Sequence, residues 1–299
     1  MKKLSVCVLF GGVSPEHEVS LRSAESVLNN LDKEKYNIFP VGITKTGEWI
    51  LYGGRDYSKL PTGEWQHCPE NRRAAISPVR GQGLLNFEGD CVVRERIDVV
   101  FPVLHGENGE DGSIQGLLQL AGLPYVGPGV AASATCMDKT LTKLVAKALN
   151  IPAVEYIRVG ETDYARRGKF LLKNIETRLK YPVVVKPAHL GSSIGISVAE
   201  TEAEAKAAVD AAFLLDDRVI IERFLKNKRD INCAAYSLGG EIFVSEPEEA
   251  ACGEKIYSFA DKYLKAHPRI SQRNTEKTAD SAATELSDGD FSGRKSAGG

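Results

Sequence analysis

The chain has 299 residues, of which 42% are hydrophobic and 26% are charged, and its formal net charge is −2. This composition is ordinary for a globular protein, so it excludes a collagen-like or disulfide-dense chain as a whole. The near balance of charge argues against a protein that binds nucleic acid through bulk positive charge, and the length is enough for two or three domains.

The N-terminal part of the chain alternates strands with helices. An apolar run over 4–10 ends at Gly11-Gly12, which is typical of a strand buried on both faces of a parallel sheet. Ser20 is placed to cap a helix. The other expected elements are strands and helices in alternation: helix 20–31, strand 38–43, strand 97–104 and helix 114–121. This order predicts right-handed βαβ units, and the Gly- and Pro-rich segment 52–96 predicts an insertion or an edge hairpin.

A second block follows Gly127-Pro128-Gly129. Thr201 and Glu204 have the spacing of a capping box at the start of an Ala-rich helix. The expected elements are again strands and helices: helix 138–149, strand 154–159, a partly helical segment 164–179, strand 181–186, helix 201–213, and strands 219–224, 231–238 and 242–244. Gly239-Gly240 predicts a hairpin between the last two strands.

The C-terminal segment 269–299 has few large apolar residues, so we expect a tail that cannot bury enough surface to fold. The six cysteines are scattered without a C-x-x-C pair, which predicts reduced, structural thiols. The apolar run near the N-terminus is too short for a membrane helix and has no signal-peptide cleavage site after it. We therefore expect a cytoplasmic protein.

A glycine loop is the first candidate site. Gly191, Ser192, Ser193 and Gly195 follow a predicted strand that carries Lys186. Glycines allow backbone N–H groups to turn towards an anion, and the hydroxyls and the lysine add donors and charge. The alternative is an ordinary glycine-rich hairpin, and the loop alone does not decide between the two. It is not a Walker A loop.

Two polar loops lie at the carboxyl ends of predicted parallel strands, where α/β folds bind ligands. One carries Glu16, and the other carries His105 with three carboxylates among three glycines. Carboxylates such as Asp111 are also common helix caps, so both loops have a purely structural alternative. His105 is the residue that capping explains least.

Three further positions are weaker signals. Lys139 lies in the first turn of a predicted helix, where a cation opposes the helix dipole, and this hints at an anionic ligand. A strand that ends at Glu222 could offer its backbone to an adenine. The Lys262-Tyr263 pair alone is typical of a surface segment.

Six motifs in order resemble the D-alanine–D-alanine ligase family of ATP-grasp enzymes, over roughly residues 1–267. They are GGVSPEHEVSL at 11–21, LHGENGEDGSIQGLLQLAGLPYVG at 104–127, MDK at 137–139, VVVKPAHLGSSIGIS at 183–197, IIERFL at 220–225 and DKYL at 261–264. The resemblance implies an α/β ATP-grasp fold. Its expected parts are a Rossmann-like parallel-sheet domain 1–127, a small central α+β subdomain 128–218, an incomplete C-terminal α+β subdomain 219–267 and a disordered tail 268–299.

The resemblance also implies a reaction, in which ATP phosphorylates one D-alanine and the amine of a second attacks the acyl phosphate. It assigns ATP binding to a set of residues in the motifs: Lys139, Lys186, Gly191, Ser193, Gly195, Glu222, Leu225 and Lys262. Asp230 lies near the ribose-binding position, one residue further along than in the family pattern. Glu16 would hold the ammonium of the first D-alanine, linked through Ser192 to Tyr263, and His105 would lie beside the substrates. The resemblance associates Tyr263 with D-alanine, and not D-lactate, as the second substrate.

The chain departs from the family pattern after Leu264, because the Arg, Asp and Glu-x-Asn motifs that bind two Mg²⁺ do not follow. We expect ATP and Mg²⁺ as cofactors, without metal ligands identified in this chain. The departure suggests a truncated or frameshifted member, which should bind ATP poorly and ligate negligibly. Alternatives are a D-alanine–D-serine or other ATP-grasp carboxylate–amine ligase, and a non-catalytic nucleotide-binding remnant. The expected partners are small molecules, not nucleic acid or membrane, and a homodimer is compatible with the resemblance.

Overall fold

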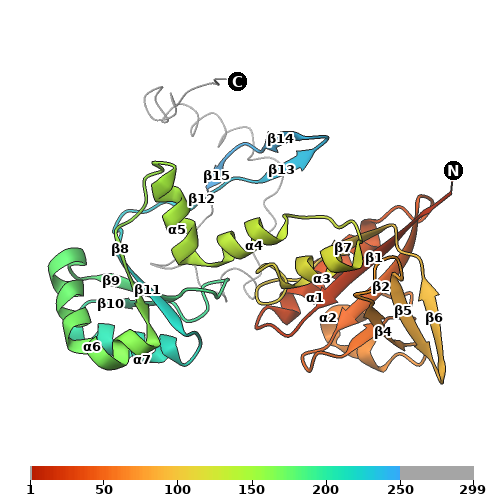
Figure 1. Ribbon diagram of the computed structural model, residues 1–299, viewed down its shortest axis with the longest axis horizontal. Helices are drawn as coiled ribbons and strands as arrows, with labels where there is room; N and C mark the ends of the chain where they lie inside the picture. The colour runs from red at the N-terminus through yellow and green to blue at the C-terminus, as the bar shows by residue number, and fades with distance from the viewer. Residues whose placement is uncertain (1, 250–299) are drawn as a thin grey trace. The chain divides into compact units, whose positions relative to one another are not determined.

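The computed structural model describes residues 2–249 (Figure 1). Its first sheet has seven strands in the order β6-β5-β4-β3-β2-β1-β7. β1 is parallel to both β2 and β7, which confirms the predicted parallel order of these three strands. The bounds are β1 Leu4–Gly11, β2 Tyr36–Ile43, β3 Trp49–Leu51, β4 Arg72–Ile76, β5 Leu84–Glu88, β6 Cys91–Glu95 and β7 Val99–Pro102.

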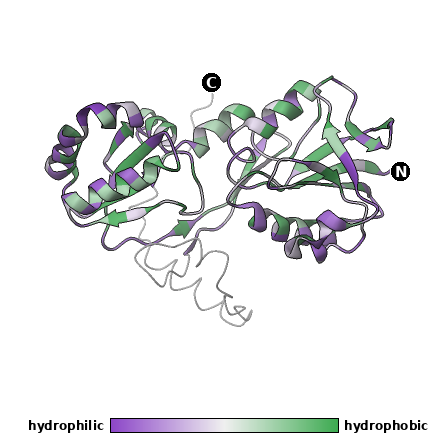
Figure 2. Ribbon diagram, turned by 90° about the horizontal axis from the view of Figure 1, so that it is seen from below, coloured by the Kyte–Doolittle hydropathy of each residue, from purple (hydrophilic) through white to green (hydrophobic). Residues whose placement is uncertain are grey.

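Strand β1 is buried because its side chains alternate between two apolar layers. Val6, Val8 and Phe10 pack with α1 (His17–Asn30), α2 (Lys59–Thr62) and the 3₁₀ turn η1 (Glu64–His67). Cys7 and Leu9 pack on the other face with α3 (Ser113–Ala121). Helices therefore cover both faces of the sheet, as the apolar run predicted. Figure 2 shows the same pattern, with hydrophobic residues concentrated on strands and hydrophilic ones on helix surfaces.

Helix α1 begins at His17, three residues before its predicted start, so Ser20 is not its cap as we expected. The Ser20 hydroxyl instead accepts a hydrogen bond from the Gly11 N–H and donates one to the Val103 carbonyl. Ser20 thereby joins the ends of β1 and β7. The role of Ser20 thus depends on a hydrogen bond to a residue far along the chain, which residue type alone does not predict.

The segment 52–96 forms antiparallel strands that extend the sheet beyond β3, with β6 at the edge. This agrees with an insertion that joins the sheet edge. The sheet as a whole is therefore mixed, with its parallel part confined to β2, β1 and β7.

Two helices follow the first sheet, α4 (Val130–Met137) and α5 (Lys139–Ala148). The sequence predicted α5 but not α4. Asp138 is the N-cap of α5, and its Oδ1 accepts hydrogen bonds from Thr140 N at 2.7 Å and Leu141 N at 3.2 Å. This cap fixes the helix start that carries Lys139.

The second sheet has four antiparallel strands in the order β10-β9-β11-β8. One face packs on α6, α7 and the π-helical turn η2. Thr201 caps α7 by accepting from Glu204 N at 3.2 Å, as predicted. The bounds are β8 Tyr156–Gly160, α6 Glu161–Asn174, η2 Ile175–Leu179, β9 Val183–Pro187, β10 Ser197–Ala199, α7 Glu202–Phe213 and β11 Arg218–Arg223.

The other face of this sheet holds polar side chains because residues alternate along each strand. In β9, Val183 and Val185 join the apolar core, so Lys186 points to the opposite face. In β11, Val219 and Ile221 do the same, so Glu222 shares that face with Lys186. Strand β11 belongs to this sheet, although the sequence placed residues from 219 on in the next subdomain. The domain boundaries themselves stay predictions.

The remaining described strands are short. The predicted strand 231–238 is divided into two, and Gly239-Gly240 makes the expected hairpin with φ values of +63° and +88°. The bounds are β12 Ile231–Asn232, β13 Ala235–Leu238, β14 Glu241–Val244 and β15 Glu248–Glu249. None of the helices within residues 2–249 has both the length and the hydrophobicity to cross a bilayer. The predicted tail lies outside the described residues.

Candidate active site

A part-buried ion cluster lies between α5 and the second sheet. The Glu222 carboxylate pairs with Lys186 Nζ through Oε2 and with Lys143 Nζ through Oε1, the latter at 2.9 Å. The three side chains are 11% to 24% exposed. Burial raises the pKa of Glu222, but the charge and hydrogen bond of Lys186, followed by those of Lys143, outweigh it, so this pKa lies below its ordinary value. Glu222 is therefore held as an anion between two cations.

Lys143 is anchored by three kinds of contact. Besides Glu222, its ammonium donates to the Val154 carbonyl at 3.3 Å and lies 5.3 Å from the centre of the Tyr156 ring. Lys143 and Lys139 are four residues apart on α5 and hence share one helix face. Lys143 was not among the predicted site residues, and its spacing from Lys139 is the local signal that could have indicated it.

Lys139 lies beside this cluster as a half-buried cation. Its ammonium donates to the carbonyls of Ala188 and Leu190, the former at 3.4 Å. Burial lowers the pKa of Lys139, and the nearby charge of Lys186 lowers it further, against the opposing charges of Asp216, Glu222 and Asp138. Two close ammonium groups in a part-buried place favour a bound anion, which would relieve their repulsion.

The glycine loop follows β9. Its backbone is left-handed at Ser192, Ser193 and Gly195, with φ values of +46°, +63° and +69°. Gly195 must stay small, because a Cβ would lie 2.7 Å from both Leu215 and Pro187 side-chain atoms. The Ser192 hydroxyl donates a hydrogen bond to Glu16 Oε1, so the loop contacts the strand-end loop of the first sheet.

Glu16 is a buried carboxylate, 5% exposed, at the N-cap of α1. Its backbone N–H donates to the Ser14 hydroxyl at 3.1 Å. Two glycines make room for it, since a Cβ at Gly106 would lie 2.2 Å from Glu16 Oε2 and one at Gly191 would lie 3.0 Å from it. The structure thus brings Glu16, Ser192 and Gly191 together, as the motifs implied.

The loop 104–112 packs beside Glu16 through Gly106. His105 Nε2 lies 3.1 Å from the Ser23 hydroxyl of α1. Asp111 accepts from Asn108 N at 2.8 Å and Ser113 N at 2.9 Å, so it holds the turn before α3, whose N-cap is Gly112. Asp111 therefore has the structural role that was its alternative interpretation, which is to hold the turn before a helix. His105 lies next to Gly106, which contacts Glu16.

The other predicted residues fall into two groups. Leu225 is 48% exposed, and Asp230 is paired with Lys228 at 2.5 Å between side-chain N and O atoms. Lys262 and Tyr263 lie outside the described residues, as does any metal ligand in 250–299.

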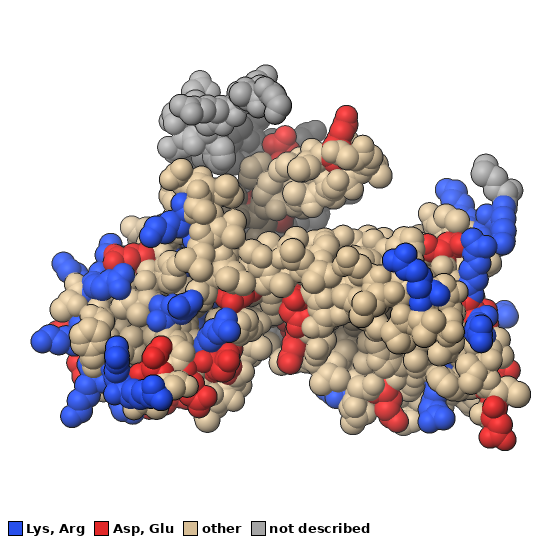
Figure 3. Space-filling view, in the orientation of Figure 1, with Lys and Arg blue, Asp and Glu red and all other residues tan. Residues whose placement is uncertain are grey.

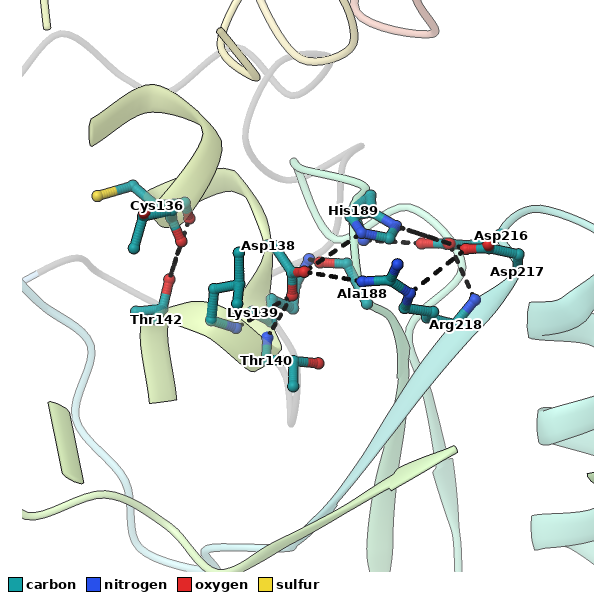
Figure 4. Close-up of polar contacts among 12 residues, drawn as sticks. Cys136, Asp138, Lys139, Thr140, Thr142, Ala188, His189, Asp216, Asp217 and Arg218 are labelled. Carbon is teal, nitrogen blue, oxygen red and sulfur yellow. Dashed lines mark hydrogen bonds and ion pairs between the residues drawn. The ribbon is translucent and has the colours of Figure 1, made fainter. Parts of the chain in front are cut away.

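A second polar cluster was not predicted (Figure 4). The His189 ring lies between two carboxylates, with Nδ1 2.8 Å from Asp216 Oδ1 and Nε2 3.4 Å from Asp138 Oδ2. Arg218 Nη1 also reaches Asp138 Oδ2 at 3.4 Å. These partners are 27 to 80 residues apart in the chain, so no local pattern indicates them.

The described residues do not supply a site that fits Mg²⁺. Within 2–249, the group of three metal-ligating side chains is His189, Asp216 and Asp217. Mg²⁺ prefers oxygen ligands in octahedral geometry, whereas this group contains an imidazole. Both Asp216 oxygens already accept hydrogen bonds, and the Arg218 guanidinium lies 4.0 Å from Asp217 Oδ1. The Glu222 carboxylate is likewise occupied by two lysines.

The described surface carries charges of both signs. In the view of Figure 3, Lys and Arg side chains are interspersed with Asp and Glu and do not form one basic field. The positive charge of the candidate site is instead local, in Lys139, Lys143 and Lys186.

Two protein-family models together match nearly the whole chain. The family model described as D-ala D-ala ligase N-terminus matches residues 5–128, and the one described as D-ala D-ala ligase C-terminus matches residues 145–288. The second match runs past residue 267, where the motifs ended the resemblance.

Relatives and solved structures agree with these models. D-alanine--D-alanine ligase from Caldicellulosiruptor bescii is 44% identical over 265 residues, covering 88% of this chain and 71% of that protein. The enzyme of the same name from Clostridium acetobutylicum is 42% identical over 288 residues, covering 93% and 78%. VanG D-Ala:D-Ser ligase from Enterococcus faecalis has a TM-score of 0.77 at 32% identity, covering 95% of this chain and 82% of that one. The D-alanine-D-alanine ligase from Coxiella burnetii has a TM-score of 0.73 at 35% identity, covering 83% and 71%. The predicted ATP-grasp fold is confirmed.

Proposed function

Because the chain belongs to the D-alanine–D-alanine ligase family, we propose that it joins two D-alanines into D-alanyl-D-alanine, with conversion of ATP to ADP and phosphate. The product serves peptidoglycan precursor synthesis. The reaction class is an ATP-dependent carboxylate–amine ligation.

The single observation that carries the proposal is the contact between Ser192 and Glu16. It joins a phosphate-type loop of the second sheet to a buried carboxylate at the strand-end loop of the first sheet. A ligase of this class needs an anion site for the nucleotide next to an ammonium site for the amino acid. The contact supports the presence of these two sites next to each other.

On the nucleotide side, Lys139 and Lys186 bind the phosphates of ATP, and the loop of Gly191, Ser193 and Gly195 supplies backbone and hydroxyl donors. Lys186 exchanges Glu222 for phosphate, while Lys143 keeps the buried Glu222 charge paired. The strand end with Glu222 and Leu225 faces the adenine, and Asp230 faces the ribose. Positive charge at the transferred phosphoryl group stabilises a transition state whose charge spreads over its oxygens.

On the amino-acid side, Glu16 accepts the ammonium of the first D-alanine, and Ser192 orients Glu16. The carboxylate oxygen of this D-alanine attacks the γ-phosphorus of ATP, and the bond to the β-phosphate oxygen breaks to release ADP. The amine of the second D-alanine then attacks the acyl carbon and expels phosphate, which takes up the proton that the amine loses as the amide forms. His105 lies beside the substrates, and Lys262 and Tyr263 complete the site. Holding two small reactants in line accounts for a large part of such a rate.

Mg²⁺ is the cofactor that the family uses with ATP, and when bound it neutralises phosphate charge. Residues 2–249 offer no site that fits this ion. We propose the cytoplasm as the location, because the reaction draws on its ATP pool. The homodimer stays a prediction.

D-alanyl-D-serine synthesis is the second candidate, because the VanG D-Ala:D-Ser ligase has a TM-score of 0.77 with this chain. Tyr263 favours D-alanine as second substrate.

The test is ADP release by the full chain with ATP, Mg²⁺ and D-alanine alone, or with D-alanine plus D-serine or D-lactate. Release with D-alanine alone, with the dipeptide identified by mass, supports the proposal. A dipeptide formed only with D-serine favours the second candidate. ATP binding measured by calorimetry without ADP release would identify a non-catalytic nucleotide-binding remnant and overturn both.

A further inference from the structure

His189 lies at the base of the glycine loop, and the proposed reaction does not use it. Asp216 holds it twice: the backbone N–H of His189 donates to Asp216 Oδ2 at 2.7 Å, and its Nδ1 lies 2.8 Å from Oδ1. The side chain of Asp216 is only 4% exposed. A buried carboxylate that accepts two such bonds fixes both the backbone and the ring of its partner.

The second ring nitrogen faces another element. Nε2 lies 3.4 Å from Oδ2 of Asp138, whose side chain is 6% exposed and caps α5. Figure 4 shows the ring between the cap of α5 and the turn before β11. The ring therefore ties together three segments that each carry a candidate site residue: the loop, the helix of Lys139 and the strand of Glu222.

The backbone on either side of His189 holds Lys139. The carbonyls of Ala188 and Leu190 accept from its ammonium, and the Ala188 carbonyl also accepts from its backbone N–H at 3.0 Å. A movement of the chain at 189 would shift both acceptors. The place of the Lys139 ammonium thus depends on how Asp216 holds His189.

We infer that His189 is a positioning residue for nucleotide binding, which sets the base of the glycine loop and the Lys139 ammonium through Asp216 and Asp138. This inference rests on the proposed function, because the ligand is the phosphate chain of ATP. His189 acts without touching that ligand.

The test compares three variants of the full chain. His189→Leu removes both ring nitrogens at similar volume, and His189→Asn keeps one amide donor for Asp216. Asp217→Asn is the matched control, because its carboxylate is 72% exposed and lies 3.9 Å from the same ring nitrogen. We expect His189→Leu to weaken ATP binding, measured by calorimetry, by about tenfold or more, the size expected for a lost charge-assisted hydrogen bond. The ATP affinity of His189→Asn should stay within about threefold of wild type. The ATP affinity of Asp217→Asn should equal that of wild type.

A second measurement does not need nucleotide. Hydrogen exchange of the ligand-free chain should quicken in His189→Leu over residues 188–195 and the first turn of α5, with the first sheet unchanged. ATP affinity and exchange that both match wild type would overturn the inference, as would equal losses in the Leu and Asn variants. If wild type itself binds no ATP, the proposed function fails at its nucleotide step. Unchanged exchange would then overturn the positioning role, and faster exchange in this segment would support it.

Discussion

The region around Glu222 and the region around Glu16 both bury a glutamate, but they surround it with opposite chemistry. Glu222 is 8% exposed and contacts two ammonium groups, with a third cation, Lys139, close by. Glu16 is 5% exposed and contacts the hydroxyl of Ser192. The first region holds a surplus of positive charge and suits an anionic nucleotide. The second holds a negative charge and suits an ammonium. Each region therefore suits a different substrate of the proposed reaction, the first ATP and the second D-alanine.

The largest expected effect comes from breaking the Glu222 cluster. Glu222→Gln leaves Lys186 and Lys143 without their anion in a place where they are 24% and 15% exposed. We expect a loss of about 3 kcal/mol in the free energy of unfolding, near the lower end for a broken buried pair. Chemical denaturation measures it. Lys147→Met, an exposed lysine one turn along α5, is the control and should change the stability by less than about 0.5 kcal/mol.

The same cluster predicts how stability depends on pH. The pKa of Glu222 is lowered from 4.5 in the folded chain, so its contribution is fully present above that value and is lost as the pH falls through the lower folded-state pKa. The difference in unfolding free energy between wild type and Glu222→Gln should therefore be constant near neutral pH and shrink in acid. A difference that grows in acid would contradict the charge pairing.

Glu16→Gln tests the other region, with a smaller effect on one substrate. Removing the charge should weaken D-alanine binding on the order of tenfold to a hundredfold, while ATP affinity stays near wild type. Separate calorimetric titrations with ATP and D-alanine distinguish these effects. Glu18→Gln is the matched control, because Glu18 is 54% exposed and pairs with Lys45. Equal losses for both ligands would break the comparison between the two regions.

The smallest expected effect lies outside both regions. Thr201→Ala removes the cap of α7, whose hydroxyl accepts from Glu204 N. It should reduce unfolding free energy by about 1 kcal/mol and leave ATP and D-alanine affinities unchanged. Denaturation and the same titrations would check this. An altered ATP affinity would mean that the second sheet passes strain from its helical face to Lys186.

The sequence predicted those parts of the fold whose signals are local. The apolar run of β1 indicated burial on both faces, and the Thr201 cap and the Gly239-Gly240 hairpin were found from spacing and residue type. The four strands β3 to β6 were missed as separate strands, because each has only three to five residues and β6 is exposed along nearly its whole length. Strand pairing there depends on neighbours in space.

The candidate site was predicted only in part for the same reason. The motifs led to Glu16, Ser192, Lys139, Lys186 and Glu222. The structure pairs Glu16 with Ser192 and Lys186 with Glu222, and it places Lys139 close enough to the second pair to feel its charges. Lys143 and His189 were missed, since their partners lie far along the chain. Electrostatic partners depend on the packing of separate elements, which residue type and spacing do not specify.

The left-handed backbone of the glycine loop limits how this protein can be stabilised. Ser192 and Ser193 occupy a conformation that is costly for any residue with a Cβ, by about 1 kcal/mol each, and that glycine adopts freely. Glycine at either position would relax the loop but remove a hydroxyl, and at 192 that hydroxyl is the contact with Glu16. At 192 the loss of the hydrogen bond to the buried Glu16 carboxylate would cost about 1–3 kcal/mol or more, which exceeds the relieved strain, so stability and ligase activity both favour serine there. The left-handed backbone at Ser192 is thus a cost that one hydrogen bond to a buried carboxylate offsets.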